Sequence, residues 1–166
     1  NTTWHNASSA IRQLRDNGLL SVPAIRRTDI EQIASVITSS GYYNVKARRL
    51  KSLCDWLHRH GEIDDLRQRP LAELRKELLA VHGIGRETAD DILLYALDKP
   101  VFVIDSYTSR LFSRLGLLRE DAHNEELRAG FESALPIDAS LFNQYHALIV
   151  HHAWHSFQKT HRCEQC

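Results

Sequence analysis

Apolar side chains recur at helical spacing along almost the whole chain, and this periodicity limits the folds that are open to it. In "LLAVHGIGRETADDILLYAL", residues 78–97, two such stretches flank a Gly-Ile-Gly turn. An apolar residue at every third or fourth position is typical of an amphipathic helix, whereas a half-buried strand alternates every second residue. Convincing alternation is absent, so the sequence predicts an all-α fold.

Several of the helical segments have recognisable ends. Thr28 and Glu31 have the spacing of a capping box, which predicts that one helix begins there. Pro70 suits the first turn of another helix, and Gly116 follows a third. The expected helices span residues 3–15, 28–38, 43–60, 70–81, 87–97, 106–115, 124–134 and 139–155.

The chain has the size of one large domain or of two small lobes, because it contains 166 residues. Pro100 is the best candidate boundary between an N-terminal lobe, residues 1–99, and a C-terminal lobe, residues 100–166. The chain begins at Asn1 and contains no methionine, so we expect it to be a piece of a longer polypeptide.

Charge and cysteine usage narrow the class of protein. Twenty-one basic and 21 acidic residues give a net charge of zero, which argues against a general nucleic-acid coat but leaves room for a local basic face. Three cysteines do not make a disulfide framework, so a reducing compartment is favoured. No apolar run approaches the roughly 18 residues of a membrane span. We expect a cytoplasmic protein, at the nucleoid if the source is bacterial, with no membrane partner.

The Gly-Ile-Gly turn at 83–85 has two interpretations. It can be a plain turn between two helices. Alternatively, its backbone amides and the start of the next helix form an anion site, for which a phosphate oxygen is a natural ligand. The residues around the turn favour the second interpretation, with Gly83, Gly85 and Arg86 as candidate contacts to a DNA backbone.

These residues also carry a resemblance to a known family. The segment 78–97, followed by "PVFVIDSYTSRLFSRLGL", resembles the helix-hairpin-helix DNA glycosylases of the endonuclease III superfamily. "SGYYNVKARRL" and "NTTWHNASSAI" are similar to earlier segments of the same family, in the same order. The resemblance implies two helical lobes with a DNA-binding cleft between them, a monomer bound to double-stranded DNA, and cleavage of the N-glycosidic bond of a base flipped out of the duplex.

Asp105 follows the apolar run Val101–Ile104 and precedes a predicted helix. It can be a helix N-cap, which contributes about 1 kcal/mol. The resemblance implies that it is also the catalytic carboxylate. A fixed carboxylate can stabilise the positive charge that develops on the sugar or take a proton from an attacking water. The two roles are compatible, because a capped helix start fixes the side chain.

Glu87 departs from the pattern of the bifunctional members, which carry a lysine at the same place and also nick the strand. That lysine attacks the sugar and forms a Schiff base, which a glutamate cannot do. The sequence therefore resembles the monofunctional branch most, in particular the 3-methyladenine DNA glycosylases. Glu87 can also be only a first-turn acid that the helix dipole favours.

Four aromatic residues are candidates for a base pocket or for the wedge that fills the gap left by the flipped base. A methylated purine is positively charged, so it gains from stacking and cation–π contact. The candidates are Trp4, Tyr42, Tyr43 and Trp154. The resemblance places Trp4 next to the flipped base and Tyr42 at the wedge, although each aromatic residue could equally belong to a core.

The run "NVKARRLK" adds a candidate basic face. Its Lys46, Arg49 and Lys51 lie near one side of a predicted helix, and Lys46 is the candidate phosphate contact beside the wedge. A solvated face without a partner is the alternative.

The tail ends in Cys163-x-x-Cys166, a candidate pair of ligands for a metal site. Endonuclease III relatives bind a 4Fe–4S cluster with four cysteines, but Ser156 stands at the first of these positions and the fourth lies beyond the chain. Zinc bound with histidines is conceivable. We expect no cluster in this chain and no cofactor for the chemistry. Cys54 is expected in a core.

The sequence thus predicts a monofunctional glycosylase that excises alkylated purines through water attack assisted by Asp105. Two alternatives stay open at this point. One is an endonuclease III-like glycosylase for oxidised or mismatched pyrimidines, with lyase activity. The other is a non-catalytic helix-hairpin-helix module that only binds DNA.

Overall fold

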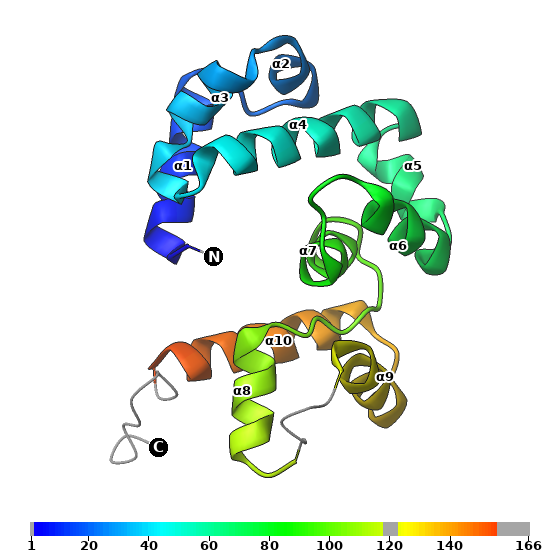
Figure 1. Cartoon of the computed structure of the whole chain (residues 1–166). Helices are drawn as coiled ribbons and strands as arrows, with labels where there is room; N and C mark the ends of the chain where they lie inside the picture. The colour runs from blue at the N-terminus through cyan, green and yellow to red at the C-terminus, as the bar shows by residue number, and fades with distance from the viewer. Residues whose placement is uncertain (1, 118–122, 156–166) are drawn as a thin grey trace. The chain divides into compact units, whose positions relative to one another are not determined.

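The structure, a computed structural model, describes residues 2–117 and 123–155, apart from the side chains of Trp154 and His155. All regular secondary structure in these ranges is helical, without a strand (Figure 1). This confirms the predicted all-α fold. None of the helices within the described ranges has the length and apolarity that a membrane crossing requires.

The helices follow one another along the chain with short connections. The first seven elements are α1 (Trp4–Asp16), α2 (Val22–Arg27), α3 (Ile30–Val36), the 3-10 helix η1 (Thr38–Ser40), α4 (Tyr43–His60), α5 (Ile63–Gln68) and α6 (Leu71–Ala80). The others are α7 (Arg86–Asp91), the π-helix η2 (Ile92–Ala96), α8 (Ser106–Arg114), α9 (Asn124–Ala134) and α10 (Ala139–His155).

The predicted bounds of α4, α9 and α10 are confirmed, but the sequence did not predict α2 and α5. Each of these two helices has six residues, which is less than two turns and too short for a helical period to show. The start of α2 is instead stabilised by a capping side chain and a proline. The Ser21 hydroxyl accepts the N–H of Ala24 at 3.3 Å, and Pro23 lies in the first turn.

The predicted capping box at Thr28 is wrong. The Thr28 hydroxyl donates to the carbonyl of Ala24 at 2.8 Å, so it closes α2 rather than opening α3. Asp29 is the N-cap of α3, and its side chain makes no capping hydrogen bond. The error arose because α2 was missed, and Thr28 serves as the C-cap of that helix.

The predicted helix at 87–97 changes its hydrogen-bond pattern midway. After α7, the N–H of Leu97 donates to the carbonyl of Ile92 at 3.2 Å, five residues back, as in a π-helix. Such turns are rare and occur often at functional sites. The wider turn changes the direction in which the side chains of η2, including Tyr95, leave the helix.

The contacts divide the chain into two compact units. The first contains the chain up to Gln68 together with Lys76–Ile84, and the second contains Arg69–Arg75 together with the chain from Gly85 onward. The predicted boundary at Pro100 falls inside the second unit, so the lobes 1–99 and 100–166 stay a prediction.

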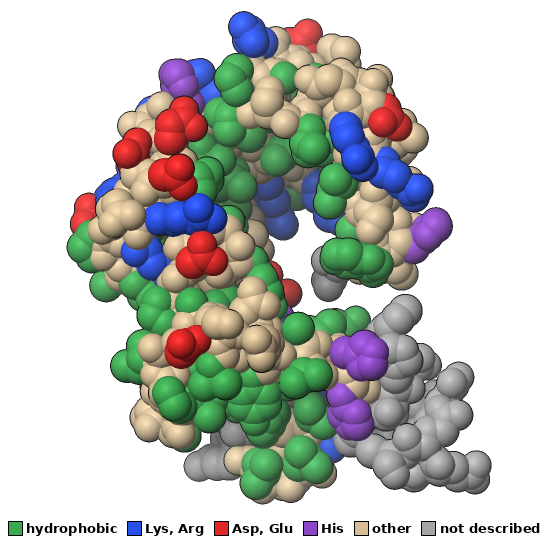
Figure 2. Space-filling view, turned by 180° about the vertical axis from the view of Figure 1, so that it is seen from behind, with side chains coloured by type: hydrophobic (Ala, Val, Ile, Leu, Met, Phe, Trp, Pro, Cys, Tyr) green, Lys and Arg blue, Asp and Glu red, His purple; other side chains and the backbone are tan. Residues whose placement is uncertain are grey.

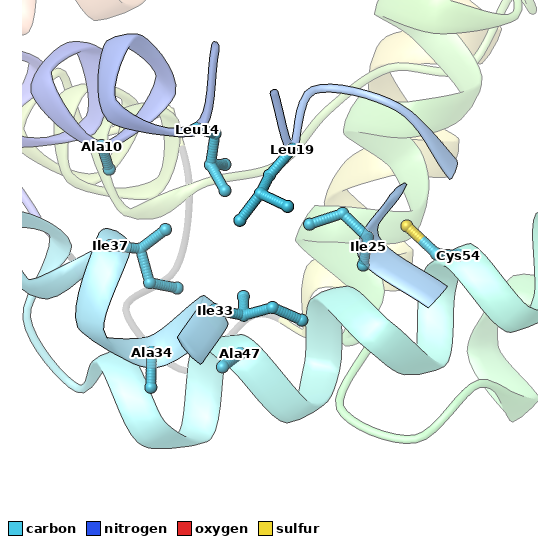
Figure 3. Packing of buried hydrophobic residues seen from close by; sticks show 9 residues of the cluster. All are labelled: Ala10, Leu14, Leu19, Ile25, Ile33, Ala34, Ile37, Ala47 and Cys54. Atoms are coloured by element: carbon cyan, nitrogen blue, oxygen red, sulfur yellow. The ribbon is translucent and has the colours of Figure 1, made fainter. Parts of the chain in front are cut away.

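The core of the first unit lies where α2 and α3 pack against α4 (Figure 3). Its side chains point toward one another from α1 through α4. They are Ala10, Leu14, Leu19, Ile25, Ile33, Ala34, Ile37, Ala47 and Cys54. Cys54 is 5% exposed, which confirms its predicted place in a core, and burial raises the pKa of its thiol.

The core of the second unit forms around the extended run Val101–Ile104. These residues are buried, and the ring of Phe102 stacks on Phe131 at 4.2 Å between ring centroids. The N–H of Phe102 donates to the carboxylate of Glu132 at 3.0 Å, which satisfies a buried backbone group outside any helix. The run therefore anchors the chain just before Asp105.

Candidate active site

Asp105 is the N-cap of α8, as predicted. Its Oδ1 accepts the N–H of Thr108 at 2.7 Å, and the residue is only 8% exposed. The buried run Val101–Ile104 fixes the chain before it, and α8 fixes the chain after it. The carboxylate is thus held by the backbone on both sides.

His146 of α10 lies on the other side of the Asp105 carboxylate. Its Nε2 is 3.6 Å from Asp105 Oδ2, an ion-pair distance rather than a hydrogen bond. Its Nδ1 is 2.6 Å from the hydroxyl oxygen of Tyr95 in η2. A phenol, an imidazole and a carboxylate thus follow one another, from Tyr95, which is 44% exposed, to the buried His146 and Asp105.

The surroundings of Asp105 favour its charged form. Burial by itself would raise the pKa of Asp105, but the His146 side chain and the N–H of Thr108 outweigh it, so the pKa lies below the ordinary value of an aspartate. The carboxylate is therefore ionised at neutral pH.

Two further acids come from α7. Burial raises the pKa of Asp91 to about 6, and the charges of Glu87 and Asp105 add to that shift against the opposing effect of His146. Although Glu87 is exposed, partial burial of its carboxyl and the charge of Asp105 raise its pKa as well. Because Glu87 and Asp91 are four residues apart, they lie on one face of the helix. No lysine or arginine contributes to these shifts.

The acids do not form a metal site. Within residues 2–117 and 123–155, no three histidine, cysteine or carboxylate side chains are grouped so as to hold a metal ion. Cys163 and Cys166, the predicted metal candidates, lie outside the described residues.

The predicted hairpin lies between α6 and α7. The N–H of Ile84 donates to the carbonyl of Val81 at 3.1 Å, and Gly83 has a φ of +84°, which favours glycine. A side chain at Gly83 would also collide with that of Arg49. Gly85 precedes α7 as an N-cap without a side chain. The tight turn is confirmed, and its role as a phosphate site stays a prediction.

The three basic residues singled out on α4 differ in what they contact. Lys46 donates to the carbonyl of Ser40 at 2.5 Å, and Lys51 donates to the carbonyls of Arg26 and Thr28. Arg49 is exposed, and its side chain lies against Gly83 of the hairpin. Arg49 is therefore better placed beside the turn than Lys46, whose ammonium group binds the backbone.

Arg86 of the hairpin pairs with Glu125 at 3.1 Å, although 66% of its side chain is exposed. Both acidic and basic side chains appear on the face drawn in Figure 2, and the net charge of the chain is zero. Because the net charge is zero, a contact with a polyanion is expected to rest on local cations such as Arg86.

Three of the four predicted pocket aromatics are described, and all of them are exposed. Trp4 is 82%, Tyr42 78% and Tyr43 40% exposed, and they belong to the first unit. Tyr42 has a φ of 47°, an uncommon conformation for a residue other than glycine. The side chain of Trp154 lies outside the described residues. Large exposed aromatics are available for stacking, and their roles stay predictions.

Sequence reasoning missed three members of the site. Asp91 and Tyr95 follow Glu87 by four and eight residues, so helical spacing could have found them. His146 lies 41 residues beyond Asp105, and no local pattern points to it. Only the packing of α10 against α8 and η2 brings His146 to the carboxylate.

The structure combines an all-α fold, a glycine hairpin and a buried, ionised aspartate at a helix start. This is the combination expected of a helix-hairpin-helix DNA glycosylase. Residues 1–136 match the HhH-GPD superfamily of base excision DNA repair proteins. The chain belongs to this superfamily of DNA glycosylases, which confirms the resemblance seen in the sequence.

Particular relatives are similar over the whole chain. The putative DNA repair glycosylase MJ1434 of Methanocaldococcus jannaschii is 40% identical, over all of this chain and 77% of that protein. Endonuclease III of Sulfolobus acidocaldarius is 29% identical, over all of this chain and 73% of that protein. Among solved structures, the Helicobacter pylori 3-methyladenine DNA glycosylase bound to 1,N6-ethenoadenine is 27% identical with a TM-score of 0.76, covering 92% of this chain and 79% of that one.

Proposed function

We propose that this protein is a monofunctional DNA glycosylase that excises alkylated purines from duplex DNA. One observation carries the proposal. Asp105, Glu87 and Asp91 interact electrostatically around the candidate centre, and no lysine side chain is among the groups that shift their pKa values. The likeness to a 3-methyladenine glycosylase agrees with this substrate class.

The chemistry follows from charge. An N-alkylated purine nucleotide is already cationic, so its N-glycosidic bond breaks with the electron pair on the base, which leaves neutral. The positive charge passes to the sugar, where the Asp105 carboxylate stabilises it. Water then adds to the anomeric carbon and gives up a proton, and the strand stays intact. The carboxyl groups around Asp105 favour positive charge at each of these reaction steps.

The direct test is excision from duplexes that each carry a single lesion, under single-turnover conditions. We expect an alkylated purine to be released at least about tenfold faster than an oxidised or mismatched pyrimidine, and the strand to break only after alkali. Fastest excision of an oxidised pyrimidine would favour the second candidate, which the relationship to the Sulfolobus endonuclease III supports.

Glu87 gives a sharper test of the monofunctional assignment. We expect the wild-type protein to form no covalent adduct with an abasic duplex under borohydride, because a carboxylate cannot form a Schiff base. Glu87→Lys should give weak trapping. The start of α7 favours the free amine, but Asp105 and Asp91 favour the ammonium ion.

Glu87→Gln is the matched control, since it removes the charge without adding an amine. Trapping by the wild type would overturn the monofunctional assignment. If Glu87→Lys fails to trap while it still binds abasic DNA, Glu87 does not lie beside the sugar.

We also propose that the hairpin, with Arg86, Arg49 and Lys46, binds DNA phosphates. Affinity for undamaged duplex should then fall steeply with salt despite the zero net charge, with a log–log slope near 0.9 per contacted phosphate. Arg49→Ala should lower this slope by about 0.9. Arg27→Ala removes an exposed arginine of α2 and should leave it unchanged. Equal slopes for the wild type and Arg49→Ala would exclude Arg49 as a contact.

A further inference from the structure

His146 is a buried titratable group that the proposed chemistry does not yet use. Its Nε2 is buried, lies 3.6 Å from Asp105 Oδ2 and has no hydrogen-bond partner within the described part of the chain. A buried polar nitrogen without a hydrogen-bond partner costs free energy, and the group that Nε2 faces is the Asp105 carboxylate. The other carboxylate oxygen is already held by Thr108.

The hydroxyl of Tyr95 determines which ring nitrogen carries the proton. Burial, with Asp91 and Asp105 nearby, raises the pKa of Tyr95 to about 12, so the phenol keeps its proton at neutral pH. It can then donate to His146 Nδ1 at 2.6 Å. In a neutral imidazole that accepts at Nδ1, the ring proton sits on Nε2, the atom that faces Asp105.

We propose that His146, oriented by Tyr95, is the positioning residue of Asp105. Its Nε2–H faces the second carboxylate oxygen at 3.6 Å, while the Thr108 N–H bonds the first, and it stabilises the ionised form of Asp105 beside two other acids. Proton transfer is not part of this role. Residues that orient a reactive side chain in this way are a general feature of active sites.

The titratable groups around His146 come from each element packed against it. They are Glu87 and Asp91 of α7, Tyr95 of η2 and Asp105 at the start of α8. Three of these are acids, so loss of the His146 Nε2–H removes a group that stabilises the charge of Asp105 next to the other two carboxyls. The titration midpoint of Asp105 should therefore rise.

The test is a carbon-13 NMR titration of the side-chain carboxyls in the full chain, with Asp105→Asn used to assign the Asp105 signal. His146→Leu should raise the midpoint of Asp105 by about one pH unit or more. His146→Gln keeps an N–H near the place of Nε2 and should restore part of the shift. Tyr95→Phe should give a smaller rise in the same direction.

Tyr145→Phe is the matched control. Tyr145 neighbours His146 in α10, but its ring packs against Phe102 and Phe131, so the Asp105 midpoint should stay at the wild-type value. An unchanged midpoint in His146→Leu would overturn the proposal. If that variant does not fold, an unchanged midpoint in both His146→Gln and Tyr95→Phe would do the same.

The consequence for excision rests on the proposed function, whereas the carboxyl titration does not. If the protein is a glycosylase, the acid limb of its single-turnover rate should move to higher pH by the same amount as the Asp105 midpoint, with DNA affinity unchanged. A merely structural role would lower the rate at every pH without moving the limb, and would count against the proposal. Absence of excision with a shifted midpoint would remove the proposed function and leave the positioning role in place.

Discussion

Asp105→Asn should keep the fold and the affinity for DNA while it lowers the single-turnover rate of excision by about 10²-fold or more. The fold should survive because asparagine is as good an N-cap as aspartate and can still accept the N–H of Thr108. Excision should suffer because the neutral amide no longer stabilises a cationic sugar. The free energy of unfolding at neutral pH should fall modestly, since the lowered pKa of Asp105 means that its charge stabilises the folded state there.

Asp138→Asn is the matched control for this substitution. Asp138 also caps a helix, with its Oδ1 accepting the N–H of Leu141 at 2.7 Å, but it is exposed and does not contribute to the pKa shifts of the site. It should excise at the wild-type rate. Excision by Asp105→Asn within about threefold of the wild type, at matched DNA binding, would exclude the carboxylate from the chemistry.

Arg75→Ala should lower the free energy of unfolding by about 3–5 kcal/mol. The Arg75 guanidinium donates to both oxygens of Asp90, at 2.6 and 3.1 Å, and to Glu125 at 2.7 Å. The side chain of Asp90 is only 5% exposed, so removing Arg75 leaves a buried carboxylate without its partner. A domain of this size has about 5–15 kcal/mol of stability in total, so urea unfolding should show the loss clearly.

Two further variants separate this effect from the loss of a surface charge. Arg67→Ala breaks a pair with Asp64, whose side chain is 90% exposed, and should cost about 1 kcal/mol or less. The double variant Arg75→Leu/Asp90→Leu removes both buried charges and should recover part of the stability. A cost for Arg75→Ala no larger than that of Arg67→Ala would mean that water already screens the buried pair.

Features that depend on neighbours in the chain were predictable. Asp105 caps α8 because a carboxylate directly before a helix meets free backbone N–H groups, wherever that helix lies in the fold. The turn at Gly83 and the bounds of α4, α9 and α10 follow from glycine, capping and periodicity in the same way. The superfamily was recognisable because its motif consists of these local features.

The prediction for Thr28 failed, and the backbone contacts of Lys46 and Lys51 were not foreseen, because each of these side chains has more than one possible partner. Thr28 has the spacing to open α3, but its hydroxyl closes α2, a helix too short to show a period. Lys46 and Lys51 lie on a basic run, but their ammonium groups bind backbone carbonyls of their own unit. Spacing alone does not show which acceptor is near enough.

The sequence by itself determined the all-α class, the hairpin and the position of Asp105 at a helix start, because each rests on interactions between residues a few positions apart. The tertiary structure decided what surrounds that carboxylate. Packing of α10 against α8 and η2 brings His146 to it from 41 residues away, and the π-turn of η2 places Tyr95 against the imidazole. Burial alone would raise the pKa of Asp105, and the distant His146 acts together with the local N–H of Thr108 to lower it.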